Sequence, residues 1–230
     1  MRVDIETRFL PDSIVAPAIE QRGADEAPVI TGMSPPWDSW SEDLGFRERF
    51  MPGAFRDVLL DPALDCVATW QHDDAFPLGR TTNGTLSLEE TARGLEWKAT
   101  PIWPSDRVAD YVAQVSGGYV TGTSFAFTQT DPAGEVWGMA GEEITRTILR
   151  VSGLFDTAIV THPAYAKSVV GLRRRDEWAA ANLTAREVSR IQERDADRAA
   201  DRRKASPHRG ALVRASAAAV RLSLASRGHR

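Results

Sequence analysis

Apolar and polar residues alternate with a period of two over much of the first 175 residues, which predicts a body built mainly from β-strands. The clearest example is a pair of segments, Thr85–Glu89 and Gly94–Ala99, separated by a short turn near Arg93-Gly94. We expect these two segments to form a hairpin. Further strands rich in β-branched and aromatic residues are expected at Val120–Thr128, Ile144–Val151 and Thr157–Thr161.

Helical periodicity is rarer in this part of the chain. The segment Ser105–Val115 has a capping serine, apolar residues at helical spacing and two glycines after its end, which together predict a helix. A shorter helix is expected within Pro52–Leu60. The predicted fold class is therefore mainly β (α+β), a bent sheet or β-barrel with a few peripheral helices.

Charge divides the chain into two parts. Residues 176–230 carry a net charge of +5, whereas residues 1–175 carry −9. Within the basic part, Glu177–Lys204 has no glycine or proline and repeats arginine every four residues, which predicts an exposed or partner-seeking helix. Ser206–Gly210 breaks it, and Ala211–Ala225 is a second basic amphipathic segment. We therefore expect a domain over 1–175 and an Arg-rich, helical, partly disordered C-terminal tail over 176–230.

Composition favours a soluble globular protein, with 42% hydrophobic and 26% charged residues. The first residues, Met1–Glu6, alternate as a strand does and lack the apolar stretch of a signal peptide, which indicates a cytoplasmic protein. The single cysteine, Cys66, excludes an internal disulfide. It lies in the apolar run Leu64–Ala68, where a cysteine usually packs as a small hydrophobe.

Three residues in strand-like runs carry groups suited to nucleophilic catalysis. His72 is a base, Ser124 a hydroxyl nucleophile, and Asp156 a carboxylate able to orient the base. They are far apart in sequence, so only the fold can bring them together. Read from the residues alone, each has a structural alternative: a satisfied histidine at a strand end before an acidic loop, or a polar, half-exposed residue on a sheet surface.

Neighbouring residues compete for these roles. Thr121 and Thr123 carry hydroxyls close to Ser124 in the sequence. Strand periodicity places Ser124 and Ala126 on one face, opposite the nearby phenylalanines. The competing third members are Asp73, Glu142, Glu143 and His162. For oxyanion donors, the candidates are main-chain amides of residues 163–166, with Arg146 and Arg150 interpreted as a solvated strand face instead.

Other chemistries lack their motifs. The chain has no phosphate-binding GxxxxGK[ST] loop, no HExxH motif and no cysteine pair at metal-ligand spacing. The acidic stretch Asp38–Glu48 lacks the alternation of a calcium loop and is interpreted as exposed. We therefore expect neither a metal nor an organic cofactor.

Six segments in one order resemble the HK97-type phage prohead (capsid maturation) serine protease family, whose fold is similar to that of herpesvirus assemblins. The resemblance runs from about Gly32 to about Leu172. Its segments are Glu48–Phe55, the His72 segment, Leu78–Thr81, Gly94-Leu95, Gly122–Phe127 and Pro163–Tyr165.

The resemblance implies a serine endopeptidase with Ser124 as nucleophile, His72 as base and Asp156 as third member, because the family's Gly-x-Ser-Phe pattern matches at Ser124. It also implies an assemblin-like fold. The expected substrates are the phage scaffolding protein, the major capsid protein and the protease itself, inside proheads assembling in the host cytoplasm. A homo-oligomer is possible, and no membrane is involved.

Two other functions remain open at this point. One is a non-catalytic scaffold or capsid-assembly module that keeps the protease fold. The other is nucleic-acid binding through the tail, which its net charge of only +5 and its lack of interleaved aromatics disfavour.

Overall fold

The computed structural model describes residues 5–10, 16–23, 25–161 and 169–205. The chain divides into two compact units, Met1–Trp178 and Ala179–Arg230. No helix among the described residues is both long and apolar enough to cross a membrane. The predicted segments Ser206–Gly210 and Ala211–Ala225 lie outside the described residues, so the proposed domain boundary and the disorder of the tail stay predictions.

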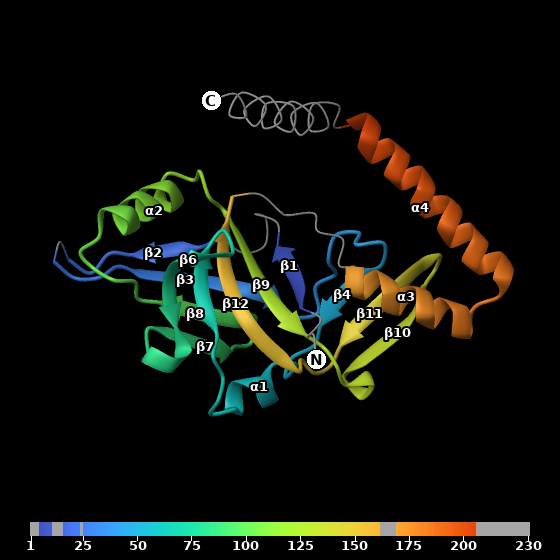
Figure 1. Ribbon diagram of the computed structural model, residues 1–230, viewed down its shortest axis with the longest axis horizontal. Helices are drawn as coiled ribbons and strands as arrows, with labels where there is room; N and C mark the ends of the chain where they lie inside the picture. Colours follow the sequence, from blue (N-terminus) through green and yellow to red (C-terminus); the bar gives the residue numbers. More distant parts are fainter. Residues whose placement is uncertain (1–4, 11–15, 24, 162–168, 206–230) are drawn as a thin grey trace, which may run out of the picture. The chain divides into compact units, whose positions relative to one another are not determined.

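The described residues of the first unit form three β-sheets (Figure 1). The five-stranded sheet has the order β1 (Glu6–Leu10), β9 (Gly122–Thr128), β12 (Gly153–Val160), β5 (Val67–Trp70), β6 (Asp73–Arg80). The four-stranded sheet has the order β2 (Ala18–Glu20), β3 (Val29–Pro36), β8 (Gly94–Ala99), β7 (Leu86–Glu90). The three-stranded sheet has the order β10 (Glu135–Ala140), β11 (Glu143–Ile148), β4 (Arg47–Phe50).

These sheets confirm a mainly β protein, but within the described residues none closes into a barrel, so the barrel alternative is wrong. The five-stranded sheet ends in two edges, β1 and β6. After β6 the chain passes through the 3₁₀ turn η1 (Thr81–Asn83) into β7, which belongs to another sheet. The likeness to assemblins stays a prediction.

The predicted hairpin is formed by β7 and β8, and the predicted helix by α2 (Asp106–Ser116). Ser105 caps α2 by accepting the Val108 N–H, and the predicted apolar face is buried. Its Tyr111 stacks on Trp70 at the end of β5, with ring centroids 4.1 Å apart. The shorter helix is reduced to α1 (Arg56–Leu60), because residues 52–55 form turns.

Two of the sequence segments that carry the family resemblance meet in the core. Phe50 and Phe55 come from the first, and Phe125 and Phe127 from β9. Phe50 lies edge-on to both β9 rings, with centroids 5.4 and 5.3 Å away. This contact fixes one face of β9 against the core and leaves Ser124 on the other.

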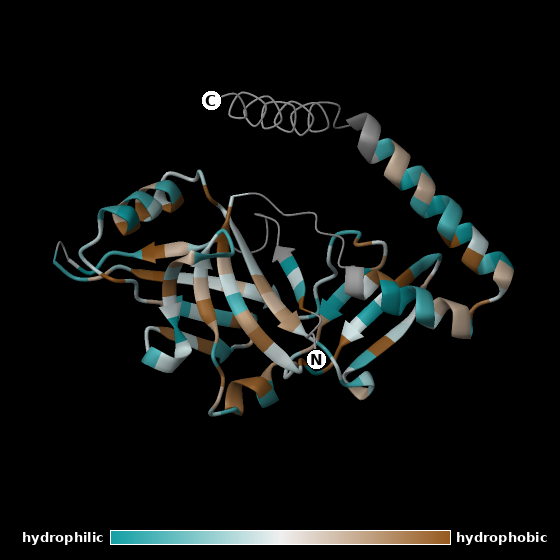
Figure 2. Cartoon of the chain, in the orientation of Figure 1, coloured by the Kyte–Doolittle hydropathy of each residue, from teal (hydrophilic) through white to brown (hydrophobic). Residues whose placement is uncertain are grey.

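The predicted continuous helix Glu177–Lys204 is wrong in one respect. The structure has two helices, α3 (Val169–Asn182) and α4 (Ala185–Ala205), because Thr184 and Glu187 form a capping box that starts a new helix. The Thr184 N–H donates to the Glu187 carboxylate at 2.8 Å, and the Glu187 N–H to the Thr184 hydroxyl at 3.4 Å. Most residues of α4 are hydrophilic (Figure 2).

A buried charge cluster joins β1 to the three-stranded sheet. Glu6 and Arg8 of β1 contact Glu48 of β4 and Arg146 of β11, and all four side chains are buried. Glu135 and Arg174 extend the cluster toward the surface, with Arg146 Nε 2.7 Å from the Glu135 carboxylate. Carboxylates and guanidiniums are equal in number, so the buried charges compensate one another.

Replacing Glu6 by glutamine is expected to destabilise the protein by about 3 kcal/mol at pH 7, since it leaves buried guanidiniums uncompensated. Burial alone would raise the pKa of Glu6, but the charges of Arg8 and Arg146 outweigh it and lower that pKa from 4.5 to about 2. The stabilisation is therefore complete above pH 4.5 and is lost as pH falls toward 2. Urea unfolding from pH 7 to pH 2.5 checks this.

Glu89→Gln is the matched control, because Glu89 is exposed on β7. This substitution should leave the free energy of unfolding within about 0.5 kcal/mol of wild type. The difference between wild type and Glu6→Gln should shrink in acid. A difference that stays constant over this pH range would show that Glu6 acts through packing and not through its charge.

Candidate active site

His72 lies in a two-residue turn that joins β5 to β6. Trp70 and Asp73 pair across the hairpin, so Gln71 and His72 are its only loop residues. Both have left-handed backbone angles, with φ of 61° and 58°, as a type I′ turn requires. Neither is a glycine or asparagine, so the turn stores strain of about 1–3 kcal/mol per residue.

The Gln71 side chain ties this strained turn to the end of β12. Its amide nitrogen lies 2.6 Å from the Thr161 hydroxyl, and its carbonyl oxygen accepts the Thr161 main-chain N–H at 3.2 Å. The Gln71 N–H donates to the Ile159 carbonyl at 2.9 Å. These bonds stabilise the turn and fix where the His72 ring projects.

The sequence predicted an acidic loop after His72, and this is wrong: Asp73 begins β6 directly. The strand accepts Pro77 and its charged residues because it is an edge strand, where a missing N–H costs no ladder bond.

The family-like segment Leu78–Thr81 also has a structural explanation. A Cβ on Gly79 would come within 2.5 Å of the Thr85 carbonyl oxygen, so glycine lets β6 approach this neighbour.

Ser124 lies on β9 between β1 and β12, with Phe9 and Ala158 as its cross-strand partners. The predicted alternation is confirmed, since Phe125 and Phe127 are buried in the core and Ser124 faces the other way. The predicted half-exposure is wrong, because Ser124 is 1% exposed. A substrate carbonyl can therefore reach its Oγ only if neighbouring groups move.

Asp156 shares this second face because of a β-bulge. Pairing between β12 and β9 shifts register after Leu154, so Asp156 lies opposite Ala126. Without the extra residue, Asp156 would oppose Phe125 and point into the core. The bulge thus turns the carboxylate toward the face that carries Ser124, called here the Ser124 face.

The three side chains form a continuous chain of contacts. His72 Nδ1 lies 3.1 Å from Asp156 Oδ1, and His72 Nε2 lies 2.6 Å from Ser124 Oγ. The His72 and Asp156 side chains are 25% and 15% exposed. With its proton on Nδ1, the imidazole donates to the carboxylate and leaves the Nε2 lone pair for the serine hydroxyl. This order of contacts is that of a nucleophile, a base and an orienting acid.

Thr69 is a fourth polar residue of this site, and the sequence analysis missed it. Its hydroxyl donates to Asp156 Oδ2 at 3.0 Å, so the carboxylate oxygen that does not face His72 is also bound. Thr69 is fully buried and pairs with Ala158 across the parallel β5–β12 ladder. Its position two residues from Val67, the strand partner of Asp156, follows from a register that the sequence does not reveal.

The Arg8 main chain also contacts the nucleophile. Its carbonyl oxygen accepts the Ser124 hydroxyl at 2.7 Å. Since a hydroxyl has one proton, Ser124 donates either to this carbonyl or to His72, and base catalysis requires the second arrangement. The buried charge cluster holds Arg8, and therefore also this carbonyl, beside β9.

The competing candidates lie elsewhere or have other partners. The Thr123 hydroxyl points to the opposite face, where it donates to the Met33 carbonyl at 2.9 Å. Asp73 accepts the Ala75 N–H at 2.9 Å, and Glu143 pairs with Arg47 at 3.5 Å. His162 and the proposed oxyanion donors of residues 163–166 lie outside the described residues.

The two arginines considered near the oxyanion site differ from each other. Arg146, interpreted from sequence as solvated, is fully buried, and its charge is compensated within the charge cluster, so that interpretation is wrong. Arg150 is half-exposed and lies 3.3 Å from Asp131.

Cys66 is buried. Its burial, and to a lesser extent the nearby negative charge of Asp156, raises the pKa of its thiol. A raised pKa disfavours the reactive thiolate.

Comparison with known proteins identifies the family of the chain. The model of a family described as caudovirus prohead serine protease matches residues 14–181. The chain belongs to this family. No curated protein and no solved structure matches the chain.

The match to the prohead serine proteases spans β2 to β12, with the His72 turn, Ser124 and Asp156, and it ends within α3. It therefore confirms the family suggested by the sequence segments, and it makes the chain a serine peptidase of phage proheads in the general sense of that family. Helix α4 lies beyond the matched residues.

Proposed function

We propose that this prohead protease is a serine endopeptidase of capsid maturation, with Ser124 as nucleophile, His72 as general base and Asp156 as the carboxylate that orients the base. The observation that carries this proposal is the contact chain Asp156–His72–Ser124, with its distances of 3.1 and 2.6 Å. Three residues scattered through the sequence meet in the order that acyl transfer requires.

In the first half of the reaction, Ser124 Oγ attacks the carbonyl carbon of the scissile peptide while its proton passes to His72 Nε2. The ionised Asp156 stabilises the imidazolium that forms and holds its Nδ1–H. The tetrahedral intermediate collapses when Nε2 returns the proton to the leaving amine. The amine product departs, and an acyl-enzyme on Ser124 remains.

In the second half, His72 Nε2 removes a proton from water as that water attacks the acyl carbon. The second tetrahedral intermediate expels Ser124 Oγ, which regains its proton from Nε2. The products are a carboxylic acid and the unchanged enzyme. Each half uses the same Asp156 contact, so loss of that contact slows both.

The substrates we propose are the scaffolding protein, or the scaffolding extension of the capsid protein, and the protease itself. Support comes from the family, whose members act in phage proheads. The net charge of −9 before residue 176 and +5 after it suits a tail held by an acidic partner in the particle.

Co-expression with the neighbouring capsid gene, followed by mass analysis of the assembled particles, tests this function. We expect the capsid or scaffolding protein to lose a defined segment, and the same particles made with Ser124→Ala to keep it. Full-length proteins in both preparations would contradict cleavage and favour the non-catalytic assembly module.

Thr69→Val is expected to lower kcat by about tenfold, equivalent to about 1.4 kcal/mol, with KM unchanged. Valine has nearly the same shape as threonine but lacks the hydroxyl that binds Asp156 Oδ2. Because Thr69 is buried, we expect its side chain to make no direct contact with the substrate. Steady-state cleavage of a fluorogenic peptide taken from the mapped site measures both constants. Thr69→Ser keeps the hydroxyl and should recover activity to within about twofold of wild type. Equal losses in the two variants would assign Thr69 to packing alone.

A further inference from the structure

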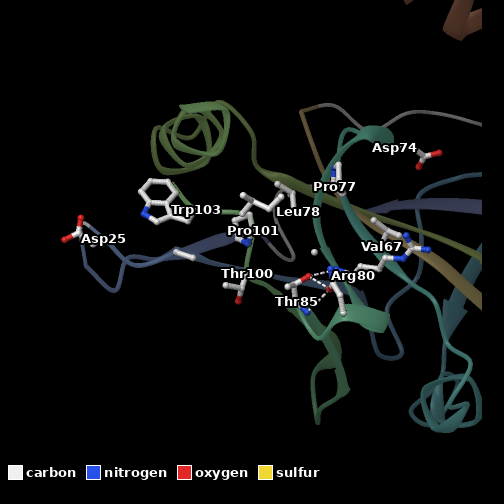
Figure 3. A pocket seen from close by; sticks show the side chains of 14 residues that line it. Asp25, Val67, Asp74, Pro77, Leu78, Arg80, Thr85, Thr100, Pro101 and Trp103 are labelled. Atoms are coloured by element: carbon white, nitrogen blue, oxygen red, sulfur yellow. Dashed lines mark hydrogen bonds between the residues drawn. The ribbon is translucent and has the colours of Figure 1, made fainter. Parts of the chain in front are cut away.

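A cavity of about 780 Å³ lies between β6 and the loop that joins β8 to α2. Leu78, Pro101 and Trp103 line one part of it, and Val67 and Pro77 lie toward the other (Figure 3). Asp25 and Asp74 lie at opposite ends (Figure 3). The cavity is thus largely apolar with an acidic residue at each end, and its size falls in the range of ligand sites.

This cavity adjoins the Ser124 face. Val67, one of its lining residues, is the direct strand partner of Asp156. Asp74, another, is two residues from His72. Strands in a sheet are about 4.8 Å apart, so a chain paired with the outer edge of β6 lies about 19 Å from β9, and an extended chain covers that distance in about six residues.

The neighbouring edge strand can pair with an extended peptide. Among the described residues β6 has a strand partner on one side only, β5. Residues 73–75 and Pro77 are exposed, whereas Leu78 and Gly79 are buried next to Thr85. A main chain added along the exposed half of β6 would place alternate side chains toward the cavity.

Ile102 is a lining residue that is exposed and not packed in the hydrophobic core. Ile102 is 82% exposed, the highest value among the large hydrophobic residues that are exposed in the described part of the chain. Ile102 adjoins Pro101 and Trp103 of the apolar lining, and contiguous apolar surface beside a concave one marks an interaction site. Arg80 also lines the cavity, but its Nε donates to the Asp65 carboxylate at 2.6 Å. Because Asp65 compensates this charge, Arg80 does not offset the negative charges of Asp25 and Asp74.

We infer that this cavity is a specificity subsite of the protease, which receives a large apolar side chain of the substrate about six residues from the scissile bond. This inference rests on the proposed function. The occupant is an extended segment of the substrate polypeptide, paired with β6. Acidic substrate residues beside the apolar one are disfavoured, because Asp25 and Asp74 lie at the ends of the cavity.

Digestion of a proteome-derived peptide library by the full-length protein, with mass spectrometric sequencing of the cleavage sites, tests this subsite. Wild type should select large apolar residues at one position about six residues from the cut. Ile102→Asp should lose that selection and favour lysine or arginine there, and should lower kcat/KM for a matched leucine peptide by about tenfold. Leu60→Asp is the control, because Leu60 is also exposed, at 75%, but lies on α1 outside the cavity.

Peptide binding separates this subsite from the catalytic proposal. In the Ser124→Ala background, a fluorescein-labelled leucine peptide should bind about tenfold more weakly when Ile102→Asp is added, and unchanged when Leu60→Asp is added. Equal binding by all three, or an unchanged cleavage profile, would overturn the subsite. If Ile102→Asp changed the oligomeric mass of the protein in solution but left peptide binding unchanged, the subsite would also be overturned. That result would assign the surface around Ile102 to self-association. Failure of wild type to react with a fluorophosphonate would overturn the proposed function alone.

Discussion

Replacing Ser124 by alanine is expected to lower peptide-bond cleavage by about 10⁶-fold, because the contact chain acts as a unit and alanine removes the hydroxyl that contacts His72 Nε2. The fold should survive. Alanine removes one buried hydroxyl that contacts His72 and the Arg8 carbonyl, a loss of about 1 kcal/mol. Single-turnover cleavage of a fluorogenic peptide and thermal unfolding measure the two effects.

Thr123→Ala is the matched control for this experiment. Thr123 is the neighbouring buried hydroxyl, but it faces away from His72 and bonds Ser34 and the Met33 carbonyl. We expect it to lose stability and to keep activity. Retained cleavage by Ser124→Ala together with inactive Thr123→Ala would reverse the assignment of the nucleophile.

Asp156→Asn is expected to lower kcat by about 10⁴-fold, nearly as large an effect as loss of the base. The amide can donate to His72 Nδ1 and so favours the tautomer whose Nε2 carries a proton, which cannot accept the Ser124 hydroxyl. His72→Ala should be at least as severe. Steady-state kinetics on one peptide compares the two.

Glu143→Gln is the control for Asp156→Asn, because Glu143 was a rival third member and instead pairs with Arg47. It should retain activity within about twofold of wild type. If Glu143→Gln were inactive while Asp156→Asn cleaved normally, the third member would be misassigned.

Local patterns predicted the regular elements. Helix α2 was predictable because its cap, its apolar face and its terminating glycines all lie within fourteen residues. The β7–β8 hairpin and the inward face of β9 followed from simple alternation. Ser124 and His72 could be proposed as candidates from their place in such runs, and the family resemblance selected them.

Features that depend on pairing between distant segments could not be predicted. The bulge between Leu154 and Asp156 turns Asp156 toward the Ser124 face, and the shift in register depends on pairing with the distant β9. The left-handed angles of Gln71 and His72 oppose local preference and rest on bonds to Thr161 and Ile159. Sequence periodicity alone therefore assigns neither the turn type nor the third member.

Burial of charge was the other failure of prediction. Arg146 lies on the same face of β11 as Ile144 and Ile148, so strand alternation places it inward, and only its charge favoured a solvated position. It is buried because Glu6, Glu48 and Glu135 arrive from three other strands to compensate it. Glu6 lies 140 residues away in sequence, so no local window contains the interaction.

The central claim, that His72 activates Ser124, is tested most directly by covalent labelling. The full-length protein would be treated with a fluorophosphonate, digested and mapped by mass spectrometry. We predict a single adduct, on the peptide that contains Ser124, with a labelling rate at least about 10³-fold lower in His72→Ala. An adduct on another residue, or labelling of Ser124 at the same rate without His72, would contradict the account.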